Sequence, residues 1–237
     1  MAAEAAGRRM SARDKDERVS KVSEATDRLC DKGIVAIVRA KSSGQLIDVA
    51  RSLLAGGVDC IEITMTTPNA LEVIRQCRKT VAGAMIGVGS VLDAATAAAA
   101  IEAGAQFVVS PVFVPGVLAK AHELDVPVVP GCFTPTEILN ATNAGADLVK
   151  VFPAGVFGPE FIKAILAPMP HLKLTPTGGV DLNTAANWIA AGAVTLGVGS
   201  ALVTKAALAD GNFDEIRRLA SQYVQIVAEA RAAKAKK

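Results

Sequence analysis

Aromatic residues are scarce in this sequence: only 4% of its 237 residues are Phe, Trp or Tyr, whereas 51% are hydrophobic. This hydrophobic fraction excludes a disordered chain, and the length allows one large domain or two small ones. The core must therefore be built from Ala, Val, Ile and Leu. These side chains are typical of buried parallel strands covered by Ala-rich helices, and they suit an antiparallel sandwich poorly.

The chain also lacks a charge excess and the Cys and His patterns that bind metals. Its 25 basic and 23 acidic residues give a net charge of +2, so we expect no nucleic-acid partner. The four cysteines form no CxxC pair and have no histidine at ligand spacing, which argues against a zinc site or a disulfide framework. His122 lies in a helical segment and His171 in a loop, so a His-ligated metal site is not expected.

Targeting signals are also lacking. No apolar run reaches the roughly 18 residues that span a membrane, and the first residues contain no hydrophobic signal region. Residues 1–18 mix four arginines with four acidic residues, whereas organelle transit peptides are poor in acids. We therefore expect a cytoplasmic protein with a disordered stub over residues 1–18, with a plastid address as the alternative.

Short apolar segments alternate with helical ones from residue 34 onward. Eight of them have the length and β-branched content of strands buried on both faces. The predicted strands are 34–39, 60–65, 85–90, 107–112, 126–131, 148–153, 172–177 and 194–199. Between them, apolar residues recur at the i, i+3, i+4 spacing of amphipathic helices.

The alternation contains an internal repeat. An Ala-Gly or, at the first site, an Ala-Gly-Gly segment precedes a strand at Gly57, Gly104, Gly145 and Gly192, where the glycine supplies the turn that ends the preceding helix. Quarter repeats in an alternation of eight strands predict an α/β fold of the (β/α)8 TIM-barrel type, with a doubly wound sheet as the alternative. We expect residues 19–237 to form this single domain, with an extra N-terminal helix packed near the bottom of the barrel and a last helix from Phe213 to about residue 233.

Lys150 stands out because it lies between Val149 and Val151 in a strand that is otherwise apolar. Lysine is rarely buried without a partner, and burial disfavours the charged form of an amine. A neutral amine is a nucleophile for a carbonyl carbon, which favours a Schiff-base lysine. The alternative is an ion-paired structural lysine.

Glu62 is the second exception, in the apolar segment 60–65. It lies on the second predicted strand and Lys150 on the sixth. Side chains from alternate strands share layers inside a barrel, so the two can face each other. A buried carboxylate near a buried amine can move protons at neutral pH, although a plain buried salt bridge is the alternative.

Further candidates lie where strands end. Arg39 ends the first predicted strand and could bind a carboxylate or another anion, or be a solvated strand end. Thr66, Ser90 and Pro111 offer hydroxyl groups or a shaped turn at the ends of the second, third and fourth strands. Thr177-Gly178-Gly179 and Gly197-Val198-Gly199-Ser200 follow the seventh and eighth strands, where barrel enzymes often bind phosphate; ordinary tight turns are the alternative.

Several of these segments, in order, make the chain similar to a known family. The segment from Val149 to Ala154 resembles the Schiff-base motif of the 2-keto-3-deoxy-6-phosphogluconate and 4-hydroxy-2-oxoglutarate aldolases. The likeness covers roughly residues 31 to 230. It continues through residues 61–64, 87–90, 109–111, 129–131, 176–179 and 197–200.

The resemblance implies a class I lyase on a (β/α)8 barrel that needs neither metal nor cofactor and is usually a homotrimer. It implies that Lys150 forms the imine and that Glu62 is the general acid/base. It implies that Ser90 contacts the substrate, that Phe152 packs at the site, and that the loops at Gly178, Gly179, Gly199 and Ser200 bind the phosphate. The other predicted substrate-binding residues are Arg39, Thr66, Pro111 and Thr177, with Arg39 as the candidate replacement for an arginine that many members have. Two positions depart from many members: Thr66 stands in place of an arginine that binds the substrate carboxylate, and Gly155 in place of a glutamate.

The predicted function is therefore cleavage of a 2-keto-3-deoxy sugar acid, of the 6-phosphogluconate type or 4-hydroxy-2-oxoglutarate, to pyruvate and an aldehyde. One alternative keeps the barrel and phosphate loops without an imine, as in a phosphosugar isomerase or epimerase. The other is a barrel without catalysis that serves in binding or assembly, an alternative suggested by Thr66.

Overall fold

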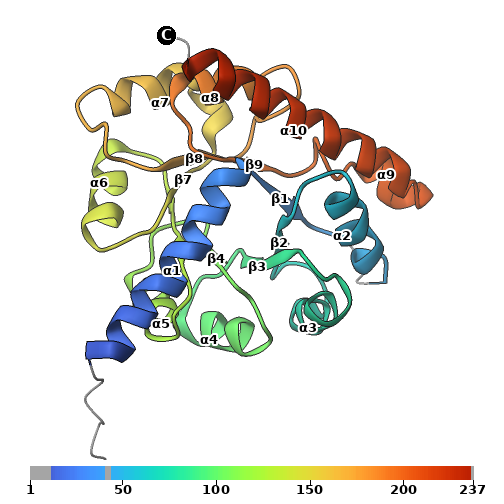
Figure 1. Ribbon diagram of the computed structural model, residues 1–237, viewed down its shortest axis with the longest axis horizontal. Coiled ribbons are helices and arrows are strands. Elements are labelled where there is room, and N and C mark those ends of the chain that lie inside the picture. Colours follow the sequence, from blue (N-terminus) through green and yellow to red (C-terminus); the bar gives the residue numbers. More distant parts are fainter. Residues whose placement is uncertain (1–11, 41–43, 236–237) are drawn as a thin grey trace, which may run out of the picture.

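The computed structural model describes residues 12–40 and 44–235, in which parallel strands alternate with helices. The strands are β1 (Ile34–Val38), β2 (Cys60–Thr64), β3 (Met85–Gly89), β4 (Val108–Val109), β5 (Val128–Val129), β6 (Gly131–Cys132), β7 (Val149–Val151), β8 (Leu174–Pro176) and β9 (Leu196–Val198). The helices that follow them lie outside the strands (Figure 1). These helices are α2 (Leu46–Ala55), α3 (Ala70–Thr80), α4 (Ala94–Glu102), α5 (Pro115–Glu123), α6 (Pro135–Asn143), η1 (Ala154–Val156), α7 (Pro159–Leu166), α8 (Ala185–Ala191), α9 (Lys205–Asp210) and α10 (Phe213–Ala235).

The strands form two parallel sheets. Six strands pair in the order β5-β4-β3-β2-β1-β9, and three pair in the order β6-β7-β8. Between β8 and β9, Val194 N donates to Leu174 O at 3.0 Å and an isolated parallel bridge joins Thr177 to Gly197. The fold is thus α/β, with its parallel strands curved into a half-barrel that a second short sheet extends.

Each of the eight predicted strand segments contains a strand, and one of them is interrupted. The segment 126–131 gives β5 and then β6, separated by Pro130, which has no N–H to donate to a neighbouring strand. The four repeat glycines have φ between 93° (Gly57) and 113° (Gly192), so they end their helices in the left-handed conformation that the sequence predicts.

The core has two parts. The larger lies between the strands and the surrounding helices, while a smaller cluster fills the space enclosed by the strands. This inner cluster contains Leu29, Val35, Cys60, Met85, Phe107, Val109, Val129 and Leu148. Val35, Cys60 and Met85 lie in the amino-terminal halves of their strands, and Phe107 and Leu148 directly precede theirs, so most of this apolar filling lies toward the amino-terminal ends of the strands.

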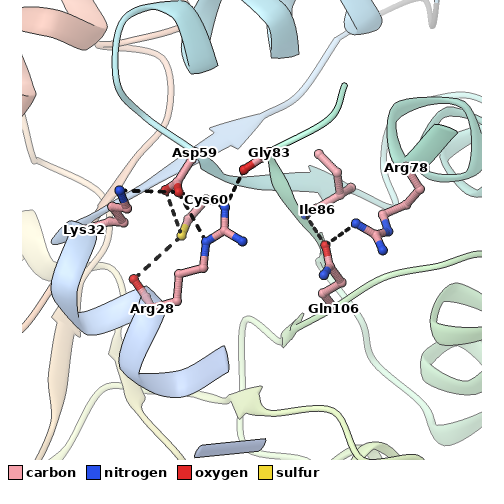
Figure 2. Close-up of polar contacts among 8 residues, drawn as sticks. All are labelled: Arg28, Lys32, Asp59, Cys60, Arg78, Gly83, Ile86 and Gln106. Carbon is pink, nitrogen blue, oxygen red and sulfur yellow. Dashed lines mark hydrogen bonds and ion pairs between the residues drawn. The ribbon is translucent and has the colours of Figure 1, made fainter. Parts of the chain in front are cut away.

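Helix α1 (Ala12–Lys32) crosses the amino-terminal ends of the strands (Figure 1). Its Leu29 enters the inner cluster, and Arg28 Nη2 contacts Asp59 Oδ2 at 2.8 Å while Lys32 Nζ lies 3.6 Å from the same oxygen (Figure 2). The predicted packing of an extra helix against the bottom of the strands is confirmed. The predicted disorder of residues 1–18 is wrong for 12–18, which are helical, and residues 1–11 lie outside the described part.

No helix within 12–40 and 44–235 combines the length and the apolar character needed to cross a bilayer.

Candidate active site

Lys150 and Glu62 occupy the middle of two strands on different sides of the inner space. Lys150 is the central residue of β7 and is 7% exposed; Glu62 is the central residue of β2 and is 2% exposed. Both line one interior cavity of about 20 Å³. The prediction that the two side chains face a common space is therefore confirmed.

The two charged groups share this cavity without touching. In the part of the chain that the structure describes, neither a hydrogen bond nor an ion pair joins the Lys150 amine to the Glu62 carboxylate. Burial raises the pKa of Glu62 above its ordinary 4.5, while the positive charges of Lys150 and Arg39 act in the opposite direction. A carboxylate with a raised pKa is a better proton acceptor, which suits a general acid/base.

Phe152 lies above the lysine. The Lys150 Nζ is 4.9 Å from the centroid of the Phe152 ring, within the range of a cation–π contact, and the ring is 38% exposed. The aromatic ring therefore covers the amine on its outer side and leaves a boundary between the interior cavity and the cleft outside.

That cleft has a volume of about 600 Å³ and lies at the carboxyl ends of β1, β8 and β9. Seven of the predicted site residues line it: Arg39, Phe152, Thr177, Gly178, Gly179, Gly199 and Ser200. Thr177 lines the interior cavity as well, so the cleft and the catalytic pair meet at this residue.

The cleft is equipped to bind an anion. Among the described residues, the backbone N–H groups of Gly178, Gly179, Gly199 and Ser200 donate to no carbonyl or side-chain oxygen. Arg39 and Lys205 add two cationic side chains without a salt-bridge partner in the described ranges. Free amides together with fixed positive charge are the usual means of binding a phosphate or carboxylate.

The cleft explains why position 155 is a glycine. Its N–H donates to Gly178 O at 2.8 Å, and a Cβ at Gly155 would lie 3.0 Å from the Gly179 Cα. The β7–α7 connection and the glycine loop after β8 thus approach backbone to backbone, and a larger residue at 155 would push the two apart.

Three predicted site residues lie outside both cavities. Thr66, Ser90 and Pro111 follow the ends of β2, β3 and β4 as the sequence predicts, but none lines the interior cavity or the anion-binding cleft. Thr66 is exposed and its Oγ1 is 2.9 Å from Thr64 Oγ1; Ser90 has a φ of 62°. Their contact with a substrate stays a prediction.

Sequence reasoning missed three residues of this site. Lys205 begins α9, a position that looks like an ordinary solvated helix end in the sequence. Thr175 and Thr195 line the interior cavity beneath the catalytic pair. Side chains two residues apart in a strand point to the same face, so the position of Thr177 could have indicated Thr175. Thr195 precedes its strand, and this alternation gives no such signal there.

The two histidines and the carboxylates and cysteines of the described residues were candidates for a metal site. No three His, Cys, Asp or Glu side chains gather as metal ligands anywhere in residues 12–40 and 44–235. His122 contacts Asp147 at 2.8 Å near the opposite, amino-terminal ends of the strands, where it also lines a separate cavity.

Comparison with known proteins places this geometry in a family. A family model described as "KDPG and KHG aldolase" matches residues 26–219. A 2-dehydro-3-deoxy-phosphogluconate aldolase of Treponema pallidum is 37% identical over 195 residues, covering 82% of this chain and 93% of the relative. The KHG/KDPG aldolase of Escherichia coli K12 is 34% identical over 193 residues, covering 81% and 91%.

Solved structures agree with these matches. One described as a native KDPGal structure superposes with a TM-score of 0.78 at 30% identity, covering 84% of this chain and 96% of the other. The KDPG aldolase of Legionella pneumophila, with pyruvate captured as a covalent carbinolamine intermediate, superposes with a TM-score of 0.77 at 26% identity, covering 83% and 96%.

Proposed function

Because the chain belongs to the KDPG and KHG aldolase family, we propose that it is a class I aldolase that cleaves a 2-keto-3-deoxy sugar acid through a Schiff base on Lys150. The products are pyruvate and an aldehyde. The observation that carries this proposal is that a buried lysine and a buried glutamate line one cavity beneath an anion-binding cleft.

Imine formation is the first chemical step. The neutral amine of Lys150 attacks the C2 ketone of the substrate and gives a carbinolamine, from which water leaves to form the protonated imine. Loss of that water needs a proton on the departing hydroxyl, and the Glu62 carboxyl supplies it. Burial raises the pKa of Glu62 above its ordinary 4.5, which favours the protonated carboxyl that this step needs.

Carbon–carbon cleavage follows from the imine. The Glu62 carboxylate removes the proton of the C4 hydroxyl, the C3–C4 bond breaks, and its electron pair moves into the protonated imine to form an enamine. The C4 fragment leaves as an aldehyde. Protonation of the enamine at C3 and hydrolysis of the resulting imine release pyruvate and return Lys150 to its free form.

The cleft supports a substrate with a second anionic group. Four backbone N–H groups of Gly178, Gly179, Gly199 and Ser200, with Arg39 and Lys205 beside them, match a phosphate at the end of the sugar acid far from the ketone. A phosphorylated substrate of the 6-phosphogluconate type then gives glyceraldehyde 3-phosphate. 4-Hydroxy-2-oxoglutarate, which carries a second carboxylate, is the other substrate, and it is named in the description of a similar solved structure.

The wider architecture of the enzyme is part of the same proposal. The hydrogen bond and the bridge between β8 and β9, together with the succession of β5 and β6, support a single closed (β/α)8 barrel domain. Large apolar side chains exposed beyond strand ends support a homotrimer, as in other members of the family. They are Leu92, Val112, Val156 and Phe157. A cytoplasmic location fits a small keto-acid substrate.

The test of the proposed function is pyruvate release. Wild-type protein should release pyruvate from 2-keto-3-deoxy-6-phosphogluconate or 4-hydroxy-2-oxoglutarate, and Lys150→Arg should release none, because a guanidinium cannot form the imine. If Lys150→Arg kept substantial activity, the lysine would act only as a charge, as in an isomerase, and the imine mechanism would be wrong. If neither substrate gave pyruvate with the wild type, the proposed function would be overturned.

A further inference from the structure

The interior cavity is lined by apolar and by polar residues. Its apolar lining includes Leu29 and Phe107, and its polar lining consists of Lys150, Glu62 and three threonines. The three threonines are Thr175, Thr177 and Thr195. Its volume of about 20 Å³ exceeds the roughly 10–15 Å³ needed to hold one water molecule, and a buried water is stable where it meets two to four polar groups.

Thr195 makes this cavity different from an ordinary packing defect. Its side chain is 1% exposed, and its Oγ1 has no hydrogen-bond partner among the described residues. A buried hydroxyl without a partner costs free energy, and such groups in native proteins usually bind ordered water. The hydroxyl belongs to a residue that lines the same cavity as the catalytic pair.

Strand register places a second hydroxyl next to the lysine. Lys150 of β7 is aligned with Thr175 of β8, so the two side chains are neighbours on the same face of the sheet. Thr175 is 5% exposed and also lines the cavity. Lys150, Glu62, Thr175 and Thr195 thus all line a space of about one water, and among the described residues no hydrogen bond or ion pair joins the two charged groups directly.

We propose that Thr195, with Thr175, is a positioning residue that holds a water molecule between Lys150 and Glu62 inside the barrel. The inference rests on the proposed aldolase function, because it assigns the route by which the lysine becomes a nucleophile. The Thr195 hydroxyl fixes the water from below, on the side away from the substrate.

The proton balance of this route is simple. The Lys150 ammonium gives one proton to the water, and the water gives one of its protons to the Glu62 carboxylate. The result is a neutral amine, a neutral carboxyl group and an unchanged water molecule. The raised pKa of Glu62 favours its protonated form at the end of the transfer, and the neutral amine is then free to attack the ketone.

The experiment compares Thr195→Val, which keeps the side-chain shape but removes the hydroxyl, with Thr195→Ser, which keeps the hydroxyl. The rate of imine formation with pyruvate is measured by rapid mixing and borohydride trapping. We expect Thr195→Val to slow this step about tenfold or more, part of the roughly hundredfold that positioned proton transfer contributes, with the pyruvate KM nearly unchanged. Thr195→Ser should restore most of the rate.

A crystal structure of the wild type and of Thr195→Val, together with their thermal unfolding, gives a readout that does not depend on turnover. The proposal predicts an ordered water within hydrogen-bond distance of Thr195 Oγ1, which Thr195→Val loses. Thr26→Val is the matched control, because Thr26 is 5% exposed and its hydroxyl donates to Val22 O on its own helix.

The outcomes separate this proposal from the proposed function. If the wild type shows no such water, or if Thr195→Val forms the imine at the wild-type rate and unfolds at the same or a higher temperature, the hydroxyl is only a packing group and the inference is wrong. If the wild type forms no imine at all but holds the water, the proposed function fails, and the proton route fails with it for lack of a nucleophilic lysine.

Discussion

Gly89 gives the carboxylate of Glu62 its place. The two residues lie on adjacent strands, and a Cβ atom built at position 89 would overlap Glu62 Oε1. The missing side chain on β3 therefore creates the space in which the catalytic carboxylate points into the interior. Glycine is needed here for its lack of a side chain and not for an unusual backbone conformation.

Gly89→Ala tests this relationship. The added methyl group should push the Glu62 carboxylate out of position and lower kcat about a hundredfold, at the lower end of what general acid/base catalysis contributes. Pyruvate release by the purified variant measures the effect. The control is Gly116→Ala, because a Cβ there meets nothing nearer than Ala94 Cβ at 4.0 Å, and it should keep wild-type turnover. Equal kcat values for Gly89→Ala and the wild type would show that the carboxylate does not need this space.

Lys205→Gln tests the anion-binding cleft. Loss of one charge beside the glycine loops should raise the KM for a phosphorylated keto acid about tenfold, since a hydrogen bond to a charged group contributes roughly 1.5–3 kcal/mol. The corresponding keto acid without the phosphate should show little change. Lys163→Gln, on the exposed face of α7, is the matched control. A uniform change with both substrates would contradict a phosphate-binding role.

Glu62→Gln separates activity from stability. The folded protein raises the pKa of this carboxyl above 4.5, so wild-type stability falls as pH rises from about 4.5 through the raised pKa, where the buried group must ionise. Glutamine removes that cost. The variant should therefore be inactive yet unfold at a higher temperature than the wild type, by a margin that grows with pH across this window. A margin that is constant with pH would mean that Glu62 has the same pKa in the folded and the unfolded states.

His122→Gln tests an ion pair far from the active site. Asp147 Oδ2 accepts from His122 Nε2 at 2.8 Å and from Val128 N at 2.9 Å, and the hydrogen bond to Asp147 raises the pKa of His122 above 6.5. The wild type should be more stable than the variant below pH 6.5, by up to about 1 kcal/mol for a partly exposed pair. This advantage should disappear as pH rises through the raised pKa, while kcat stays unchanged. Chemical denaturation across that pH range measures it.

Much of the fold follows from the sequence because its signals are local. Strands buried on both faces need continuous β-branched runs, and a polar residue in such a run is conspicuous, which is how Glu62 and Lys150 stand out. Helix α1 was placed correctly, but its start at Ala12 was missed because residues 12–18 are mostly charged and show no apolar stripe.

The rest of the site depends on distances that a sequence does not contain. Lys205 is separated from Gly178 by one helix and one strand, α8 and β9, and only the curvature of the strands brings both into one cleft. Thr195 directly precedes β9, and nothing in the sequence distinguishes it from other polar residues at the start of a strand. Its importance comes from an unpartnered hydroxyl at a cavity, a property of packing and not of residue type.

The most direct test of the central claim is covalent trapping on Lys150. The protein is incubated with pyruvate and sodium borohydride, digested, and analysed by mass spectrometry. The account predicts a reduced pyruvate adduct on the peptide that contains Lys150, and no adduct in Lys150→Arg. Absence of the adduct from the wild type, or its presence on another lysine such as Lys173, would contradict it.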